Sequence, residues 1–121
     1  MKIMLDTNFL LVPAQFGVDV YEQLRGIGYN EFFTMSACIA ELEKLAKHKK
    51  HEKHVALAMQ LIKKNHMTVI ETSITADAAI ADYADDNNIA VATLDIALIK
   101  ALKANGIKVI RLRQKKYITE D

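Results

Sequence analysis

Four acidic residues follow short apolar segments of the chain and are candidate ligands of a metal ion. Asp6 comes directly after the run "KIML", and Asp95 closes the segment "IAVATLD". Glu41 and Asp77 lie early in the helices expected after the second and third apolar segments. Magnesium and manganese ions prefer carboxylate oxygens and water as ligands. If the fold brings the four acids together, the chemistry they indicate is that of a divalent cation.

Each acid also has a purely structural explanation. Asp6, Asp77 and Asp95 occupy positions where helix caps or partners of the helix dipole are favoured, and Glu41 fits a solvated helix residue. These explanations do not account for four acids at one place, because like charges repel and raise one another's pKa unless a positive charge lies between them. An acidic metal pocket is the more economical interpretation.

The elements that would position these acids alternate along the chain. Five apolar runs predict strands at residues 3–5, 32–35, 67–70, 90–93 and 109–112. Amphipathic patterns predict helices at about 18–25, 37–47 and 52–64, one capped by Thr75 and running to about Asp86, and one capped by Asp95 that ends before Gly106.

This alternation predicts an α/β fold with a mostly parallel five-stranded sheet and helices on both faces, since parallel strands need crossover connections. The strands of such a sheet point the same way, so the residues that follow them collect at one edge, where ligands bind. The four acids are expected at that edge.

The bulk composition is that of one globular domain spanning residues 1–121. The chain has 51% hydrophobic and 26% charged residues and a net charge of +1, so contacts with nucleic acid must come from local basic patches. The single Cys38 excludes an intrachain disulfide and is best interpreted as a small buried side chain. The apolar start is interrupted at Asp6, which excludes a signal peptide or a membrane span and predicts a cytoplasmic protein.

Two basic stretches are candidates for contact with RNA. "KHKKHEKH", residues 47–54, has histidines too widely rotated on a helix to share a zinc ion, so it is either a solvated connection or a phosphate-contacting patch. The segment 111–121 forms a basic tail that either grips RNA or frays in solvent; its candidate RNA-binding residues are Arg111, Arg113, Lys115 and Lys116, beside the ring of Tyr117.

Four motifs in order, "MLDTNFL", "SACIAELEKL", "TADAAIADYA" and "AVATLD", resemble those of the PIN domain. This is a metal-dependent nuclease fold shared by VapC-type toxins and by ribosome-processing nucleases. The resemblance runs from about residue 3 to residue 112, and its specificity lies in the order and spacing of the motifs.

The resemblance implies an endoribonuclease that hydrolyses RNA phosphodiester bonds with Mg²⁺ or Mn²⁺. The family's four acids fall on Asp6, Glu41, Asp77 and Asp95, and its neighbouring polar positions fall on Thr7 or Asn8, Ser36 and Thr93. Many relatives carry paired acids at the third motif and some a further acid after the fourth, where this chain has Ala78 and Ala97. The number of bound ions therefore stays open, and Asp82 is expected to face solvent.

The partners that the resemblance implies are RNA and, since relatives often pair, a second copy of the chain. A toxin would need a protein antitoxin that blocks the acidic edge, whereas a processing enzyme would act on precursor ribosomal RNA among assembly factors. The tail "VIRLRQKKY" resembles archaeal members near the processing nucleases. The alternatives are a non-catalytic RNA- or protein-binding module that retains the fold, and a phosphoacceptor domain of the receiver type, which would want paired acids after the first strand.

Overall fold

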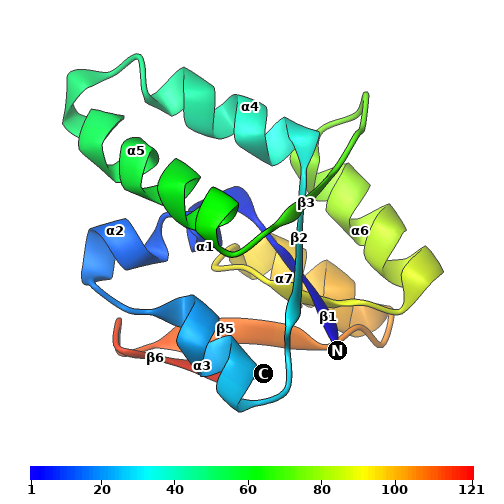
Figure 1. Cartoon of the computed structure of the whole chain (residues 1–121). Helices are drawn as coiled ribbons and strands as arrows, with labels where there is room; N and C mark the ends of the chain where they lie inside the picture. The colour runs from blue at the N-terminus through cyan, green and yellow to red at the C-terminus, as the bar shows by residue number, and fades with distance from the viewer.

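A six-stranded sheet forms the centre of the molecule, in a computed structural model that describes all residues 1–121 (Figure 1). The strand order is β3-β2-β1-β4-β5-β6, and every neighbouring pair is parallel except β5 and β6. The strands are β1 (Lys2–Leu5), β2 (Glu31–Met35), β3 (Thr68–Ile70), β4 (Ala90–Ala92), β5 (Val109–Arg113) and β6 (Tyr117–Glu120). This order differs from the 2-1-3-4-5 order of receiver-like domains.

Seven helices connect the strands. They are α1 (Thr7–Leu10), α2 (Val12–Phe16), α3 (Val20–Gly26), α4 (Ser36–Leu45), α5 (Lys49–Lys64), α6 (Ala76–Asn87) and α7 (Ile96–Ala104). Parallel strands joined by right-handed crossovers place the helices on a side set by the direction of travel across the sheet. The chain moves outward from β1 to β3 and then back past β1 to β5. As a result, α3 and α5 cover one face and α6 and α7 the other (Figure 1).

The α/β fold and the five predicted strands are confirmed, with ends that shift by at most one residue. The short helices α1 and α2 were not predicted. They total nine residues, of which α1 contributes four and α2 five, and such short segments show too little periodicity to be recognised from a sequence. Helix α5 begins at Lys49, three residues before the predicted start, so most of the "KHKKHEKH" stretch is helical rather than a connection.

The sheet has one strand more than predicted, because residues 117–120 add β6 antiparallel to β5. Of the two alternatives for the tail, fraying in solvent is therefore wrong. The turn between them places Gln114 and Lys115 at φ 55°, a left-handed conformation that residues other than glycine seldom adopt. The side-chain amide of Gln23 on α3 holds the new strand, since its Nε2 donates to the carbonyl of Lys116 and its Oε1 accepts from the amide of Ile118.

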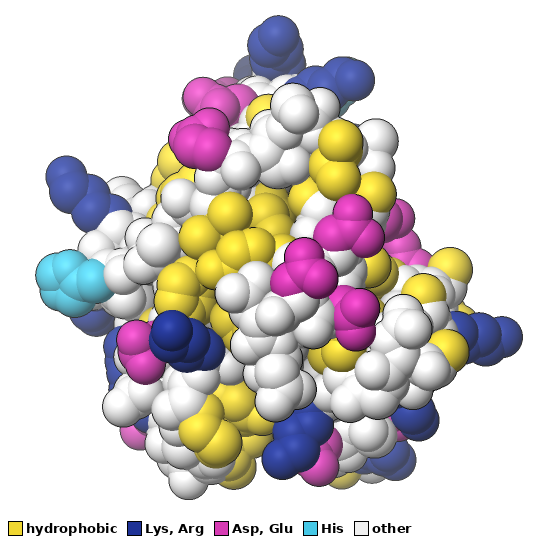
Figure 2. Space-filling model, turned by 90° about the vertical axis from the view of Figure 1, so that its right-hand side faces the viewer, with side chains coloured by type: hydrophobic (Ala, Val, Ile, Leu, Met, Phe, Trp, Pro, Cys, Tyr) yellow, Lys and Arg dark blue, Asp and Glu magenta, His cyan; other side chains and the backbone are white.

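A single core of 33 buried hydrophobic residues fills both sides of the sheet. The central strands β1 and β4, of which only Lys2 is exposed, fix the ends from which the loops leave. None of the helices is long and apolar enough to span a membrane. On the outside, Asp82, Asp85 and Asp86 of α6 are exposed, and the face at the right of Figure 1 shows acidic side chains beside an apolar area (Figure 2).

Candidate active site

One pocket at the carboxyl edge of the sheet is bounded by all four candidate acids. Its cavity volume is about 340 Å³, and the residues that line it are Asp6, Thr7, Asn8, Leu11, Glu41, Leu45, Asp77 and Asp95. The acids come from four separate segments: the end of β1, the middle of α4, and the first residues of α6 and of α7. The parallel sheet thus brings together residues as far apart in sequence as 6 and 95.

Asp6 is the most enclosed of these acids, with 4% of its surface exposed. Its Oδ1 accepts a hydrogen bond of 2.8 Å from the amide of Thr7, which is the helix cap considered from the sequence. The thiol of Cys38 donates to the same oxygen over 3.9 Å. Its Oδ2 accepts from the hydroxyl of Thr93 over 2.8 Å. The side chain is therefore fixed, and it serves as a cap while facing the pocket.

Thr93 connects two of the acids. Besides its bond to Asp6, its Oγ1 accepts from the amide of Asp95 over 3.1 Å. Asp95 in turn caps α7, because its Oδ1 accepts from the amide of Leu98 over 3.1 Å. The buried Thr93 hydroxyl thus sets the position of the α7 start relative to Asp6.

The electrostatics of the pocket are those of crowded negative charge. Burial raises the pKa of Asp6, the hydrogen bonds from Thr93 and Thr7 lower it in part, and the charges of Asp77 and Glu41 raise it further. No lysine, arginine or histidine lines this pocket, and the three ion pairs of the molecule all involve the last two residues of the chain. The charge of the four acids is therefore not compensated by any side chain that lines the pocket.

No three histidine, cysteine, aspartate or glutamate side chains already stand close enough together to share a metal ion. The donor set nevertheless fits a hard divalent cation, because four carboxylates surround a cavity that has room for water ligands. One further observation agrees with a polar occupant: the Oγ1 of Thr7 is buried without a hydrogen-bond partner on the wall of this pocket. Small side-chain rotations would be needed for several acids to reach one ion.

The other polar residues named from the sequence have different positions. Asn8 lines the pocket, and its Oδ1 accepts from the amide of Leu94, which fixes the loop after β4. Ser36 contacts none of the acids; its Oγ accepts from the amide of Thr72 over 2.9 Å and so anchors the loop before α6. Ser36 therefore acts on the position of Asp77 from a distance.

Cys38 is the residue near the site that sequence reasoning missed. It lies three residues before Glu41 in α4, one helical turn away, and this spacing is the only sequence signal that it shares a side of the helix with an acid. Burial raises the pKa of its thiol, the nearby hydroxyls of Thr7 and Thr34 lower it in part, and the charge of Asp6 raises it. The thiol remains a hydrogen-bond donor toward Asp6.

The four candidate RNA-binding residues all lie on the β5–β6 hairpin but are not equivalent. Arg111 pairs with Asp121 over 3.5 Å. The ammonium of Lys115 lies 5.5 Å from the ring centre of Phe16 on α2. Arg113 and Lys116 are exposed and take part in no ion pair. Because β5 runs parallel to β1, the hairpin turn lies at the same edge of the sheet as the acids.

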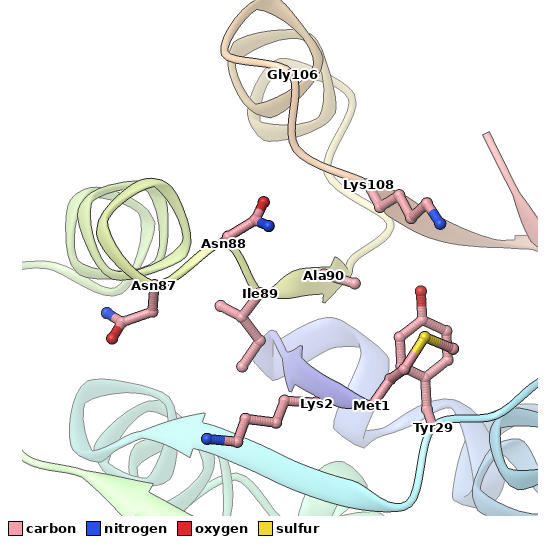
Figure 3. A pocket seen from close by; sticks show the side chains of 9 residues that line it. All are labelled: Met1, Lys2, Tyr29, Asn87, Asn88, Ile89, Ala90, Gly106 and Lys108. Carbon is pink, nitrogen blue, oxygen red and sulfur yellow. The ribbon is translucent and has the colours of Figure 1, made fainter.

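Another cavity, of about 440 Å³, lies at the opposite, amino edge of the sheet (Figure 3). Its two lysines point away from each other in this view. Lys2 lies over the ring of Phe33, and Lys108 pairs with Glu120 over 3.8 Å. This cavity contains no acid and no convergent set of polar groups, so it does not compete with the carboxyl-edge pocket as the reactive site.

Comparisons with known proteins agree on one family. A family model described as "PIN like domain" matches residues 3–115. A protein named ribonuclease VapC4, from Methanocaldococcus jannaschii, is 38% identical over 122 residues, which cover 96% of this chain and 93% of the relative. Ribonuclease VapC9 from Archaeoglobus fulgidus is 30% identical over 113 residues, or 93% of this chain and 84% of the relative.

Two solved structures share the fold. The PIN domain endonuclease Utp24 superposes with a TM-score of 0.82 at 20% identity, covering 99% of this chain and 90% of that structure. A domain of a functionally unknown protein from Methanocaldococcus jannaschii superposes with a TM-score of 0.61 at 17% identity, covering 93% and 91%. At these identities the two structures bear on the fold alone.

Proposed function

Since the chain belongs to the family of PIN-like domains, we propose that it is a divalent-metal-dependent endoribonuclease with Asp6, Glu41, Asp77 and Asp95 as its metal ligands. The observation that carries the proposal is the convergence of these four acids, from four separate segments, on one pocket that contains no basic side chain. The two curated relatives, which are 38% and 30% identical to this chain, are both named ribonucleases, and this supports RNA as the substrate.

Each acid has a distinct part in this proposal. Asp6, held by Thr93, Thr7 and Cys38, is the fixed ligand at the bottom of the pocket. Glu41 and Asp77 are exposed and can rotate toward it. When bound, a Mg²⁺ or Mn²⁺ ion supplies a lowered pKa for a coordinated water and stabilises negative charge on the phosphoryl oxygens. In this proposal the four acids hold the ion in place, and they act as its ligands more than as proton carriers.

The positioning residues keep the pocket in order. Thr93 relates Asp6 to the start of α7, and Ser36 relates the loop before α6 to the start of α4. Hydrogen-bond partners of metal ligands are known to matter for affinity nearly as much as the ligands themselves. We also assign RNA contacts to the β5–β6 hairpin. Arg113 and Lys116 are the main candidates, because both are exposed and neither takes part in an ion pair.

Among biological roles, we favour that of a VapC-type nuclease acting in the cytoplasm, because the names of both curated relatives point there. The partner would then be an antitoxin protein that covers the acidic edge. Processing of precursor ribosomal RNA is the second candidate, and the resemblance of the basic tail supports it. A non-catalytic module is disfavoured because all four acid positions are filled, and a receiver-like phosphoacceptor is excluded by the family and by the strand order.

The experiment that tests the function is cleavage of end-labelled RNA by the purified protein, with and without metal. We expect cleavage in Mg²⁺ or Mn²⁺, none after exhaustive treatment with EDTA, and much weaker action on single-stranded DNA. Cleavage that persists at the full rate after EDTA treatment would contradict the metal mechanism. A preparation that leaves a broad set of RNAs intact in both metals would contradict the nuclease assignment.

A further inference from the structure

A second cavity adjoins the acidic pocket and shares two of its walls. It has a volume of about 280 Å³ and is lined by Glu41, Lys44, Leu45 and His48. Glu41 and Leu45 also line the acidic pocket. The two cavities are therefore neighbouring parts of one groove, in which the acidic part is followed by a part with a basic side chain and an imidazole.

The spacing along α4 explains this arrangement. The four lining residues stand at positions i, i+3, i+4 and i+7 from Glu41, which places them along one side of the helix and its continuation. With a rise of about 1.5 Å per residue, Lys44 lies about 4.5 Å along the helix axis from Glu41. Leu45 is half buried and packs against the core, so it forms the apolar floor between the two parts.

Two features leave this second cavity able to bind an anion. Lys44 is exposed and takes part in no ion pair, although a glutamate stands three residues before it. The imidazole of His48 offers a ring N–H donor, and its backbone is held at both sides, since its amide donates to Leu45 over 3.0 Å and its carbonyl accepts from His51 over 2.9 Å. The two rings of His48 and His51 meet edge to face with centres 6.5 Å apart.

In two other cavities lined by basic side chains, one of the two cations is already paired, and neither cavity shares a wall with the acids. At the amino edge, Lys108 pairs with Glu120. On the β5–β6 hairpin, a cavity of about 360 Å³ is lined by two arginines, of which Arg111 is already paired with Asp121. Only the α4 cavity combines an unpaired cation with a wall shared with the acids.

We propose that Lys44 and His48 form a subsite for the RNA backbone phosphate next to the phosphate that is cut. This inference rests on the proposed nuclease function. A strand whose scissile phosphate lies among the acids has its neighbouring phosphate within reach one helical turn along α4. A lysine binds phosphate as a point charge, and charge-assisted hydrogen bonds are about twice as strong as neutral ones. The subsite positions the strand, and it takes no part in bond cleavage.

Binding of a cation in the acidic pocket and binding of a phosphate at Lys44 are coupled through Glu41. Glu41 lines both parts of the groove, so its uncompensated charge weakens phosphate binding at Lys44, because the two negative charges repel. Compensation of Glu41 by a cation in the acidic pocket removes that repulsion. Occupation of the acidic pocket is thus expected to strengthen phosphate binding at Lys44.

The test pairs protein variants with a change in the RNA. The wild-type protein is first used to map one cleaved bond in a short oligoribonucleotide with Mg²⁺ or Mn²⁺. Two further RNAs then carry an uncharged methylphosphonate at the linkage just before or just after that bond. The variants are Lys44→Ala, His48→Ala and the matched control Lys47→Ala, which removes an exposed neighbouring lysine that does not line the cavity. Thermal melts check that each variant folds.

We expect Lys44→Ala to raise KM for the natural RNA about tenfold, the effect of losing one charge-assisted bond, with kcat changed little. His48→Ala should act in the same direction. One of the two neutral RNAs should raise KM for the wild type and for Lys47→Ala by a similar factor, and should give no further rise with Lys44→Ala. The slope of log binding constant against log salt should fall by about 0.7 in Lys44→Ala.

Independent, multiplicative effects of Lys44→Ala and of both neutral linkages would overturn the subsite. So would a KM of Lys44→Ala equal to that of Lys47→Ala. If removal of the neighbouring base, rather than of the charge, cancels the effect of the variants, the cavity binds a nucleobase and the phosphate assignment is wrong. Absence of RNA cleavage by the wild type would instead contradict the proposed function, and this outcome is visible before any variant is compared.

Discussion

The hydroxyl of Thr93 donates a 2.8 Å hydrogen bond to Oδ2 of Asp6, across 87 positions of sequence. A threonine hydroxyl has one proton to donate, and here Asp6 receives it. The oxygen of the Thr93 hydroxyl also accepts a hydrogen bond from the amide of Asp95. One buried hydroxyl of Thr93 thus connects two acids that follow different strands, β1 and β4, and it fixes the start of α7 relative to Asp6.

Thr93→Val is expected to lower metal affinity and RNA cleavage about 10- to 100-fold, the usual effect of losing a partner of a metal ligand. Valine keeps the shape of the side chain but removes both hydrogen bonds. Thr93→Ser, which keeps the hydroxyl, should stay close to wild type. Mn²⁺ titration and cleavage rates of both variants make the comparison, and equal values for the two would show that the hydroxyl has no positioning role.

Asp6→Asn is expected to melt above the wild type at pH 7 in EDTA. Asparagine remains a good helix cap, and it removes a buried charge whose pKa is raised by burial and by Asp77 and Glu41. Because the folded pKa exceeds the unfolded value of about 3.9, Asp6 destabilises the fold progressively as pH rises from that value through the folded pKa. The advantage of the variant should therefore shrink as pH falls toward 4.

Addition of Mn²⁺ should reverse the order of the two melting temperatures. A ligand that binds only the folded protein stabilises it by mass action, and the variant has lost a ligand group. RNA cleavage should fall by orders of magnitude in the same variant. Melting curves that coincide in both buffers, together with intact cleavage, would reduce Asp6 to a helix cap.

Gln23→Met is expected to loosen the edge strand β6. The substitution keeps the length of the side chain but removes its bonds to the carbonyl of Lys116 and the amide of Ile118. We expect a loss of about 1–2 kcal/mol in unfolding free energy and faster hydrogen exchange of the Ile118 amide. Gln15→Met, on the exposed side of α2, is the matched control. Equal exchange rates of the Ile118 amide in the two variants would show that Gln23 does not hold β6 in place.

Replacement of Lys115 and Lys116 with alanine is expected to weaken RNA binding and to flatten its salt dependence. For single strands the slope should fall by about 0.7 for each phosphate contact that is lost. Turnover at saturating RNA should stay unchanged, since neither residue touches the acidic pocket. Lys115 also lies over Phe16, so a melting curve must separate loss of that contact from loss of RNA binding. Unchanged binding across a salt series would leave the hairpin without a role in RNA contact.

The parallel core of this fold and the position of its acids followed from local patterns. Apolar runs of three to five residues between amphipathic segments are sufficient to predict a parallel sheet, and a parallel sheet is sufficient to bring Asp6 and Asp95 to one edge. Strand β6 could not be predicted in this way, because the side chain that bonds to it, Gln23, lies 95 residues before the Ile118 amide. Such long-range contacts leave no periodic signal in the sequence.

The fine structure of the site was likewise beyond the sequence. The hydroxyl of Ser36 bonds to the loop at Thr72 and to none of the acids, and Cys38 is the small buried side chain that the sequence predicts but also donates to Asp6. In both cases the residue type was compatible with several partners, and the choice among them is made by loop geometry and packing. The cavity beside Lys44 depends in the same way on how far α4 continues before the chain turns.

The central claim, that four acids hold a divalent cation, is tested most directly by calorimetric titration of the protein with Mn²⁺, in the absence of RNA. Asp77 and Asp82 offer a matched pair, because both lie on α6 and only Asp77 lines the pocket. We predict saturable binding to the wild type and to Asp82→Asn, and binding at least about tenfold weaker to Asp77→Asn. Equal affinities for the two variants, or no binding to the wild type, would contradict the metal site.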